Sequence, residues 1–122
     1  MPIVDVQVVY KRVGQIRSVS AEALANALGD VFGSAPGHTW VRTHAILDAA
    51  YAENGVRLKG SELPAFVTVL HTHPPVGEAL AAEVRAVTAA VAKCIARPIS
   101  RVHVQYAPPG AGRQAFGGKL VE

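Results

Sequence analysis

The sequence of 122 residues predicts an α/β fold in which two tandem βαβ units form one four-stranded sheet with two helices on one face. Two observations predict it. Runs rich in β-branched residues alternate with runs of helical periodicity. The order strand, helix, strand also occurs twice, with Pro2 matching Pro64 and Pro36 matching Pro98 at a spacing of 62 residues. We interpret residues 1–122 as a single domain with pseudo-repeats of about 1–60 and 61–122.

The first unit begins with a strand over residues 3–9, in which the valines at 4, 6 and 8 alternate with polar residues. Such alternation is typical of a strand with one buried face. Ser20 is the expected N-cap of a helix that runs to Phe32, and Gly33 is placed to end it. The expected apolar stripe of this helix is Leu24, Leu28, Val31 and Phe32. After Pro36, the segment TWVRTHAI predicts the second strand.

The second unit follows the same plan. PAFVTVLHTH predicts a strand headed by Pro64, and an alanine-rich helix follows from about residue 78 to residue 95. The pair Arg97-Pro98 is expected to stop this helix, because proline disfavours helix in the residue before it. RVHVQY predicts the fourth strand. Residues 49–61 link the halves, and the glycine-rich tail GAGRQAFGGKLVE predicts a short hairpin that reaches a neighbouring chain.

The assembly of these elements leaves one sheet face bare. Right-handed crossovers make the strands of each unit parallel and place both helices on the same side. The opposite face therefore needs cover, and a second subunit is the expected source because a unit this small buries little of its own surface.

Composition limits the compartments and the kinds of partner that we expect for this protein. Half of the residues are hydrophobic, the formal net charge is +3, and Cys94 is the single cysteine. No apolar run is long enough for a membrane span, and no signal peptide is visible, so we expect a cytoplasmic protein without a membrane partner. The positive charge suits small anionic ligands. A nucleic-acid partner is not expected, because basic runs are absent and aromatic residues are few.

Pro2 after the initiator methionine, the two tandem βαβ units and the tail together resemble the tautomerase superfamily. FGGKL with Gly112 before it is similar to the closing segment of 4-oxalocrotonate tautomerase. LHTHPPVG is similar to a loop of the macrophage migration inhibitory factor branch, which also has two units per chain. The resemblance implies a homotrimer with an active site around each Pro2 near a subunit boundary, and no cofactor.

An N-terminal proline offers unusual chemistry. Removal of Met1 would make Pro2 a secondary amine, and a free α-amine titrates near ~8. Desolvation and nearby cations lower that pKa, with Lys11, Arg12 and Arg42 as candidate cations. A neutral amine can abstract a proton next to a carbonyl and return it elsewhere. The resemblance therefore implies a tautomerase or isomerase acting on a small keto or enol carboxylate, with Pro2 as the catalytic base and acid.

Other site residues are implied by matching positions in the superfamily. Arg12 corresponds to an arginine that grips a substrate carboxylate, and Arg42 is the expected second cation. His73 falls in a pocket-lining loop. The remaining candidates for substrate binding are His103 and Gln105, expected from an adjacent subunit, and Arg113 and Phe116 in the tail. Two departures weigh against phenylpyruvate-type substrates: GSAPG contains no lysine after the first helix, and His103 stands where tyrosine is expected.

Alternatives remain open at this point. Pro2 is also tolerated simply as the first residue of a strand. A hydratase or dehalogenase would keep the proline but needs a carboxylate to activate water, and the only acid near the tail is Glu122 at its very end. A trimeric interaction protein without activity is a third reading. His71 and His73 on one strand face invite a metal reading, but two histidines do not complete a zinc site, so no metal is expected.

Overall fold

The computed structural model describes residues 1–11 and 19–122, and its elements follow the predicted order. The first unit consists of β1 (Ile3–Tyr10), α1 (Ala21–Phe32) and β2 (Trp40–Leu47). The second consists of β3 (Ala65–Leu70), α2 (Gly77–Ile95) and β4 (Val102–Tyr106). The tail folds into the predicted hairpin of β5 (Gln114–Phe116) and β6 (Lys119–Val121). The α/β prediction is therefore confirmed.

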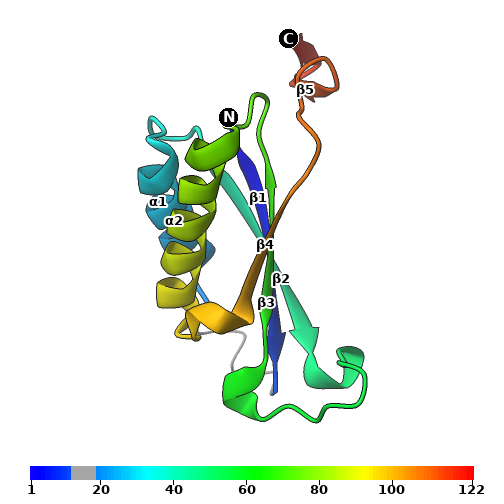
Figure 1. Ribbon diagram of the computed structural model, residues 1–122. Helices are drawn as coiled ribbons and strands as arrows, with labels where there is room; N and C mark the ends of the chain where they lie inside the picture. Colours follow the sequence, from blue (N-terminus) through cyan, green and yellow to red (C-terminus); the bar gives the residue numbers. More distant parts are fainter. Residues whose placement is uncertain (12–18) are drawn as a thin grey trace.

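The four long strands form one mixed sheet in the order β2-β1-β3-β4. β1 is parallel to β2 and β3 is parallel to β4, while the central pair β1 and β3 is antiparallel. Both helices lie on one face of the sheet and leave the other face bare, as predicted (Figure 1). The N-terminus and the tail hairpin lie at the same end of the molecule (Figure 1).

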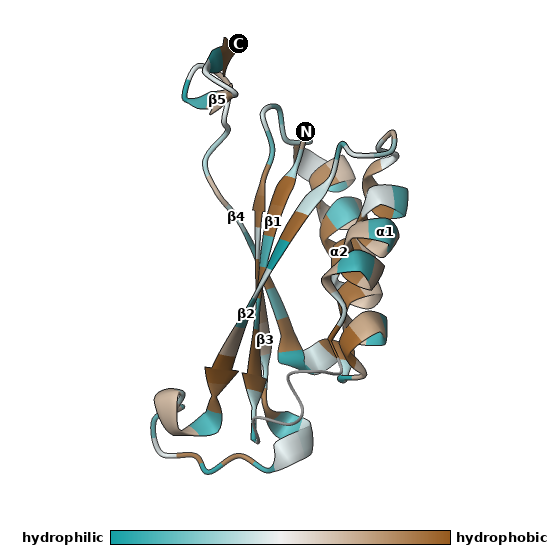
Figure 2. Ribbon diagram, turned by 180° about the vertical axis from the view of Figure 1, so that it is seen from behind, coloured by the Kyte–Doolittle hydropathy of each residue, from teal (hydrophilic) through white to brown (hydrophobic). Residues whose placement is uncertain are grey.

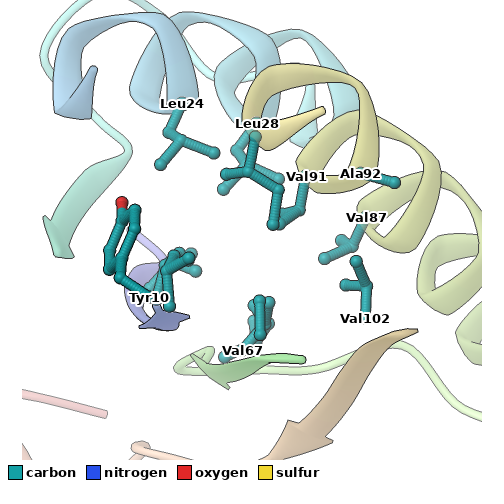
Figure 3. Packing of buried hydrophobic residues seen from close by; sticks show 14 residues of the cluster. Tyr10, Leu24, Leu28, Val67, Val87, Val91, Ala92 and Val102 are labelled. Carbon is teal, nitrogen blue, oxygen red and sulfur yellow. The ribbon is translucent and has the colours of Figure 1, made fainter. Parts of the chain in front are cut away.

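The core lies between the helices and one face of the sheet (Figure 3). Val4, Val6 and Val8 are buried there, as their alternation predicted. Leu24 and Leu28 of the predicted α1 stripe are fully buried, and so are Val87 and Val91 of α2. Hydrophobic stretches of the strands and of the inward helix sides face each other across this layer (Figure 2). Within the described residues, no helix has the length and apolar character needed to cross a membrane.

The predicted helix signals are present. The Ser20 side chain accepts a hydrogen bond from the Ala23 amide at 3.0 Å, which satisfies one of the free amides of the first turn. Gly33 ends α1 in the left-handed conformation with φ of 63°. At the end of α2, however, a non-glycine residue, Ala96, adopts that conformation with φ of 55°.

The structural repeat is 63 residues, so the predicted spacing of 62 is wrong by one. Gly33 and Ala96, which cap the two helices, are 63 residues apart. The buried pair Leu24 and Leu28 corresponds at the same spacing to Val87 and Val91. Because side chains alternate between the faces of a strand, a shift of one residue would exchange the buried and exposed faces. Aligning the prolines of the two units gave the wrong spacing, because Ala65, not Pro64, occupies the position equivalent to Pro2.

The same spacing explains the segment between the halves. Glu53 and Val56 form an isolated antiparallel bridge, and 63 residues later Phe116 and Lys119 pair in the tail hairpin. The turn residues Gly55 and Gly118 both have positive φ, at 75° and 86°. The link predicted over residues 49–61 therefore contains the first unit's counterpart of the tail.

Candidate active site around Pro2

Pro2 is buried at the head of β1. Its carbonyl accepts a hydrogen bond from the Trp40 amide at 3.1 Å, which ties it to the start of β2. On the other side, β1 and β3 pair with Ile3 opposite Leu70. Continuing this register by one residue sets Pro2 opposite His71. The head of β1 is thus enclosed by neighbouring strands on both sides.

An aromatic pair joins the tail to this end of the sheet. The rings of Trp40 and Phe116 meet edge to face, with centroids 5.2 Å apart. The Trp40 indole also donates to the Gly37 carbonyl at 2.9 Å. The fold therefore brings Phe116, a predicted site residue, to the residue that binds the Pro2 carbonyl.

A pocket of about 360 Å³ lies between the strand ends and the tail. Its lining residues are Leu70, Ala107, Pro108, Pro109, Gly110, Arg113 and Gln114. Arg113, a predicted site residue, is exposed at its edge. Apolar walls with few polar groups are typical of sites for small molecules.

Gln114 is the buried polar group of this pocket, and the sequence reasoning missed it. Its side chain is 8% exposed, and its Oε1 accepts a hydrogen bond from the Thr72 hydroxyl at 3.0 Å. Its Nε2 is buried and has no hydrogen-bond partner among the described residues. Gly110 packs closely against it: a Cβ there would lie 2.4 Å from Gln114 Oε1, so the Gln114 side chain would have to shift.

The loop after β3 is bonded along its length to the tail. The Gly110 amide donates to the His71 carbonyl at 2.9 Å, and the Ala111 amide donates to the Thr72 carbonyl at 3.1 Å. His73 is exposed, and its Nε2 lies 3.0 Å from the backbone oxygen of Glu122. Hydrogen bonds therefore join the loop that follows β3 to the tail.

The two histidines of this loop do not share a strand face, which corrects the geometry behind the metal reading. β3 ends at Leu70, one residue before His71. The His71 ring turns toward Glu83 on α2, whereas His73 turns toward the C-terminal residue. In the described part of the chain, no three histidine, cysteine or acidic side chains gather as metal ligands.

A second feature missed from the sequence is the cluster of His71, Glu83 and Tyr106. His71 Nε2 lies 2.9 Å from Glu83 Oε2, and the Tyr106 hydroxyl donates to the same oxygen. Burial raises the pKa of Tyr106 far above its ordinary value, and the hydrogen bond to Glu83 adds to the effect. No sequence signal predicts this cluster, because its members come from three separate elements.

Arg42 lies on the bare face of the sheet. Its Nε and Nη2 donate to the Asp5 carboxylate at 2.6 and 2.9 Å, in a bidentate pair. These hydrogen bonds hold the pKa of Asp5 below its ordinary value. To bind a substrate carboxylate, Arg42 would have to share its guanidinium with Asp5 or give up this ion pair. Arg12 lies outside the described residues.

His103 and Gln105 lie on the same bare face, on the edge strand β4. Gln105 donates to the Thr68 hydroxyl at 3.0 Å, and the His103 ring lies 5.6 Å from that of Phe66. The register sets His103 level with Gln7, five residues along β1 from Pro2. Within one chain these two residues do not converge on Pro2.

A third polar cluster lies near His103. Glu53 Oε2 accepts hydrogen bonds from the Tyr51 hydroxyl and from Arg101 Nη2, both at 2.7 Å. Together with the charges of Arg101 and His103, these bonds hold the pKa of Glu53 below its ordinary value. Glu53 is therefore an ionised carboxylate on the same side of the sheet as His103.

Comparison with known proteins supports the fold. No family model and no curated protein matches the sequence. Among solved structures, a fused 4-OT trimer is similar over 97% of this chain and 94% of its own, with 14% identity and a TM-score of 0.74. Macrophage migration inhibitory factor from Oncomelania hupensis is similar over 100% of this chain and 83% of its own, with 16% identity and a TM-score of 0.73.

Malonate semialdehyde decarboxylase, described with decarboxylase and hydratase activities, is similar over 94% of this chain and 90% of its own, at 19% identity and a TM-score of 0.66. These similarities extend over nearly the whole chain and include both units and the tail. At such low identity they establish the architecture. The chain thus has the fold of the tautomerase superfamily, in the form that joins two βαβ units in one polypeptide.

Proposed function

We propose that the protein is a cofactor-free tautomerase that acts on a small keto or enol carboxylate, with Pro2 as general base and acid. The observation that carries the proposal is the position of Pro2. It is buried at the head of β1, tied to Trp40 on one side and set opposite His71 on the other. The fold similarity to known superfamily enzymes supports catalytic activity of this general kind.

The chemistry requires that Met1 be removed. Pro2 then carries a secondary amine, and its buried position disfavours the charged ammonium form. The neutral amine takes a proton from the carbon next to a carbonyl, and the electron pair moves to the carbonyl oxygen as an enolate. The Pro2 ammonium then returns the proton at another atom of the substrate, so the reaction needs no other reactant. A base matched to the working pH contributes typically ~10²–10⁴-fold.

The tail and the arginines supply the binding of the substrate in this proposal. Arg113 lines the pocket between the strand ends and the tail, and its planar guanidinium suits a carboxylate. Arg12 and Arg42 remain candidates for the same negative group, and His73 and Phe116 would border the substrate. The pocket's apolar wall suits the carbon skeleton of a small acid.

We also propose that the active form is a homotrimer. The bare face of the sheet exposes residues from both edge strands, among them Trp40, Arg42, His44, His103 and Gln105. Several fused 4-OT structures of this fold are trimers. A neighbouring subunit would cover this face and would bring His103 and Gln105 toward another chain's Pro2. Sedimentation at micromolar concentration should give the trimer mass, and a stable monomer would contradict the proposal.

The decisive experiment combines intact mass with activity. A panel of enol and unsaturated keto acids is tested on protein whose mass confirms loss of Met1, alongside Pro2→Ala and a variant whose added N-terminal residue is retained. Both variants should lose activity and keep the circular dichroism spectrum of the parent. Pro36→Ala, at an exposed loop proline, is the matched control and should stay active. Full activity with Met1 attached would refute the mechanism.

Alkylation gives a second test of the same residue. A halopyruvate should modify the Pro2 amine rather than Cys94 or a lysine, and peptide mapping identifies the site. Modification should abolish turnover in proportion to its extent. A protein that is fully modified at Pro2 and still active would exclude Pro2 as the base.

A second candidate function is hydration of an unsaturated acid, and Glu53 favours it. Its carboxylate is ionised beside His103, which the trimer would bring to a neighbouring Pro2. It therefore replaces Glu122 as the candidate for activating water. The malonate semialdehyde decarboxylase described above has hydratase activity in addition. Product mass separates the candidates, because hydration adds one water and tautomerisation leaves the mass unchanged.

A further inference from the structure

The cluster of His71, Glu83 and Tyr106 joins four elements at one place. Glu83 comes from α2, Tyr106 from β4, and His71 from the loop after β3. The His71 ring also meets Phe32 of α1 edge to face at 5.0 Å and stacks on Tyr106 at 5.9 Å. The His71 and Glu83 side chains are only 13% and 16% exposed. The ring of His71 is therefore fixed from several sides.

The cluster lies beside Pro2. The β1–β3 register sets Pro2 opposite His71, and alternation places both side chains on the helix face with Val4 and Val69. Side chains opposite one another on neighbouring strands have Cβ atoms about 4.5–5.5 Å apart. A residue that holds the His71 side chain in place therefore holds the side chain that lies next to Pro2.

The same loop holds the tail. Carbonyls of His71 and Thr72 accept the amides of Gly110 and Ala111, and the Thr72 hydroxyl binds Gln114. Gln114 follows Arg113 in the chain, and both line the pocket. A continuous set of hydrogen bonds therefore leads from Glu83 through the loop to the pocket.

The repeat shows that the cluster is specific to the end that carries Pro2. At the equivalent positions, 63 residues earlier, the chain has Val8, Ser20 and Thr43. These residues cannot form an acid–histidine–tyrosine cluster. The opposite end of the sheet, where Ala65 stands in place of Pro2, therefore lacks this cluster as well.

A glutamate is an unusual residue at position 83 of α2, because its carboxylate is largely withdrawn from water there. Removing a carboxylate from water is costly unless its hydrogen bonds are replaced. Glu78 of the same helix is placed conventionally, with 85% of its side chain exposed and a 3.0 Å ion pair to Arg85. Glu83 instead directs one oxygen at both His71 and Tyr106.

We propose that Glu83 is a positioning residue for the Pro2 site: it fixes His71 and Tyr106, and through the His71–His73 loop it orders the tail that carries Arg113 and Phe116. The effect of Glu83 on catalysis rests on the proposed function, whereas its effect on the order of the tail does not. An experiment can therefore reject either effect without rejecting the other.

Amide hydrogen exchange tests the structural link without a substrate. The probes are the amides of Gly110 and Ala111, which donate to the loop carbonyls. Glu83→Ala should raise their exchange rates at least tenfold, while the Leu24 amide in the first turn of α1 stays protected. Glu78→Ala is the matched control. A rise below tenfold, or an equal rise in the control, overturns the proposal.

Two milder variants keep the test decisive if Glu83→Ala does not fold. Tyr106→Phe removes a single hydroxyl, and Glu83→Gln keeps an acceptor of the same shape. Both should raise exchange at Gly110 and Ala111 relative to the parent. Where Glu83→Ala does fold, Glu83→Gln should show most of the protection that the Ala variant loses. Unchanged exchange in both variants would exclude the role.

Kinetics test the link to the site. Glu83→Ala should lower kcat/KM by about tenfold or more, mainly through KM, because the displaced tail carries the substrate-binding Arg113. Glu83→Ala and Arg113→Ala should combine to less than the product of their separate effects, since residues acting through one element are not independent. Multiplicative effects would overturn the positioning role in catalysis. If the parent converts none of the acids, the proposed function fails while the exchange result still decides the structural link.

Discussion

Gly33 and Ala96 end the two helices in the same left-handed conformation, 63 residues apart, with φ of 63° and 55°. Their amides make equivalent bonds as well: Gly33 to the Asp30 carbonyl and Ala96 to the Lys93 carbonyl. One position has the residue that this conformation favours, and the other does not. The two positions therefore allow the free-energy cost of a Cβ in the left-handed conformation at a helix cap to be compared within one protein.

We expect Ala96→Gly to stabilise the protein and Gly33→Ala to destabilise it. A Cβ is unfavourable in the left-handed region, and the cost for a residue other than glycine is roughly 1 kcal/mol. Urea denaturation should show shifts of about 0.5–1 kcal/mol in opposite directions. No atom lies within 4 Å of a Cβ built on Gly33, so the conformation alone is tested. Destabilisation by Ala96→Gly would contradict this account.

We expect Arg97 to be a major structural residue rather than only the residue before a helix-ending proline. Its guanidinium donates to the carbonyls of Leu63 and Val9, and it lies over the Tyr10 ring at 5.9 Å. Arg97 is half-buried, and this burial lowers the pKa of its guanidinium below the ordinary value.

Arg97→Met should therefore leave two backbone carbonyls without partners and lower the free energy of unfolding by about 2–4 kcal/mol. Arg97→Lys should recover only part of the loss, because a single ammonium does not reproduce the guanidinium fork. Arg85→Met, at an exposed arginine of α2, is the control. Parent-like stability of the Lys variant would argue against a role for the fork, and parent-like stability of the Met variant would argue against a structural role for Arg97.

We expect the Asp5–Arg42 pair to make stability depend on pH in the acid range. The hydrogen bonds from Arg42 lower the pKa of Asp5 in the folded protein, so the pair's contribution is fully present above the unfolded value of about 3.9. It is lost as the pH falls through the lower folded value. The Tm difference between the parent and Asp5→Asn should therefore shrink from pH 6 toward pH 2. Asp30→Asn, at an exposed acid of α1, should not reproduce this trend, and a difference that grows in acid would reverse the assignment.

We expect the three arginines to differ in their effect on a carboxylate substrate. A lost charge-assisted hydrogen bond is worth about 1.5–3 kcal/mol, or roughly 10–150-fold in kcat/KM. Arg113→Ala and Arg12→Ala should show losses of this size. Arg42→Ala should show a smaller one, because Asp5 already occupies its fork. Unchanged kcat/KM in all three variants would reject arginine binding of the carboxylate.

The sequence by itself determined the elements and the layers. Alternating valines set the buried face of β1, Ser20 and Gly33 set the ends of α1, and the recurring strand–helix–strand order set the topology. These are local properties of the backbone and of side-chain periodicity, and each is expressed within a few residues. Pro2 could be singled out as a candidate base for the same reason, since that hypothesis depends only on its place in the chain.

Only the tertiary structure decided the spacing of the repeat and the polar contacts. Matching prolines gave 62 residues, while packing requires 63, because a one-residue shift would turn the buried valines outward. Glu83 is 12 residues from His71 and 23 from Tyr106, and Thr72 is 42 from Gln114. No periodicity connects residues so far apart. These residues meet because α2 and the tail pack against the ends of the strands, and that packing is a property of the tertiary structure.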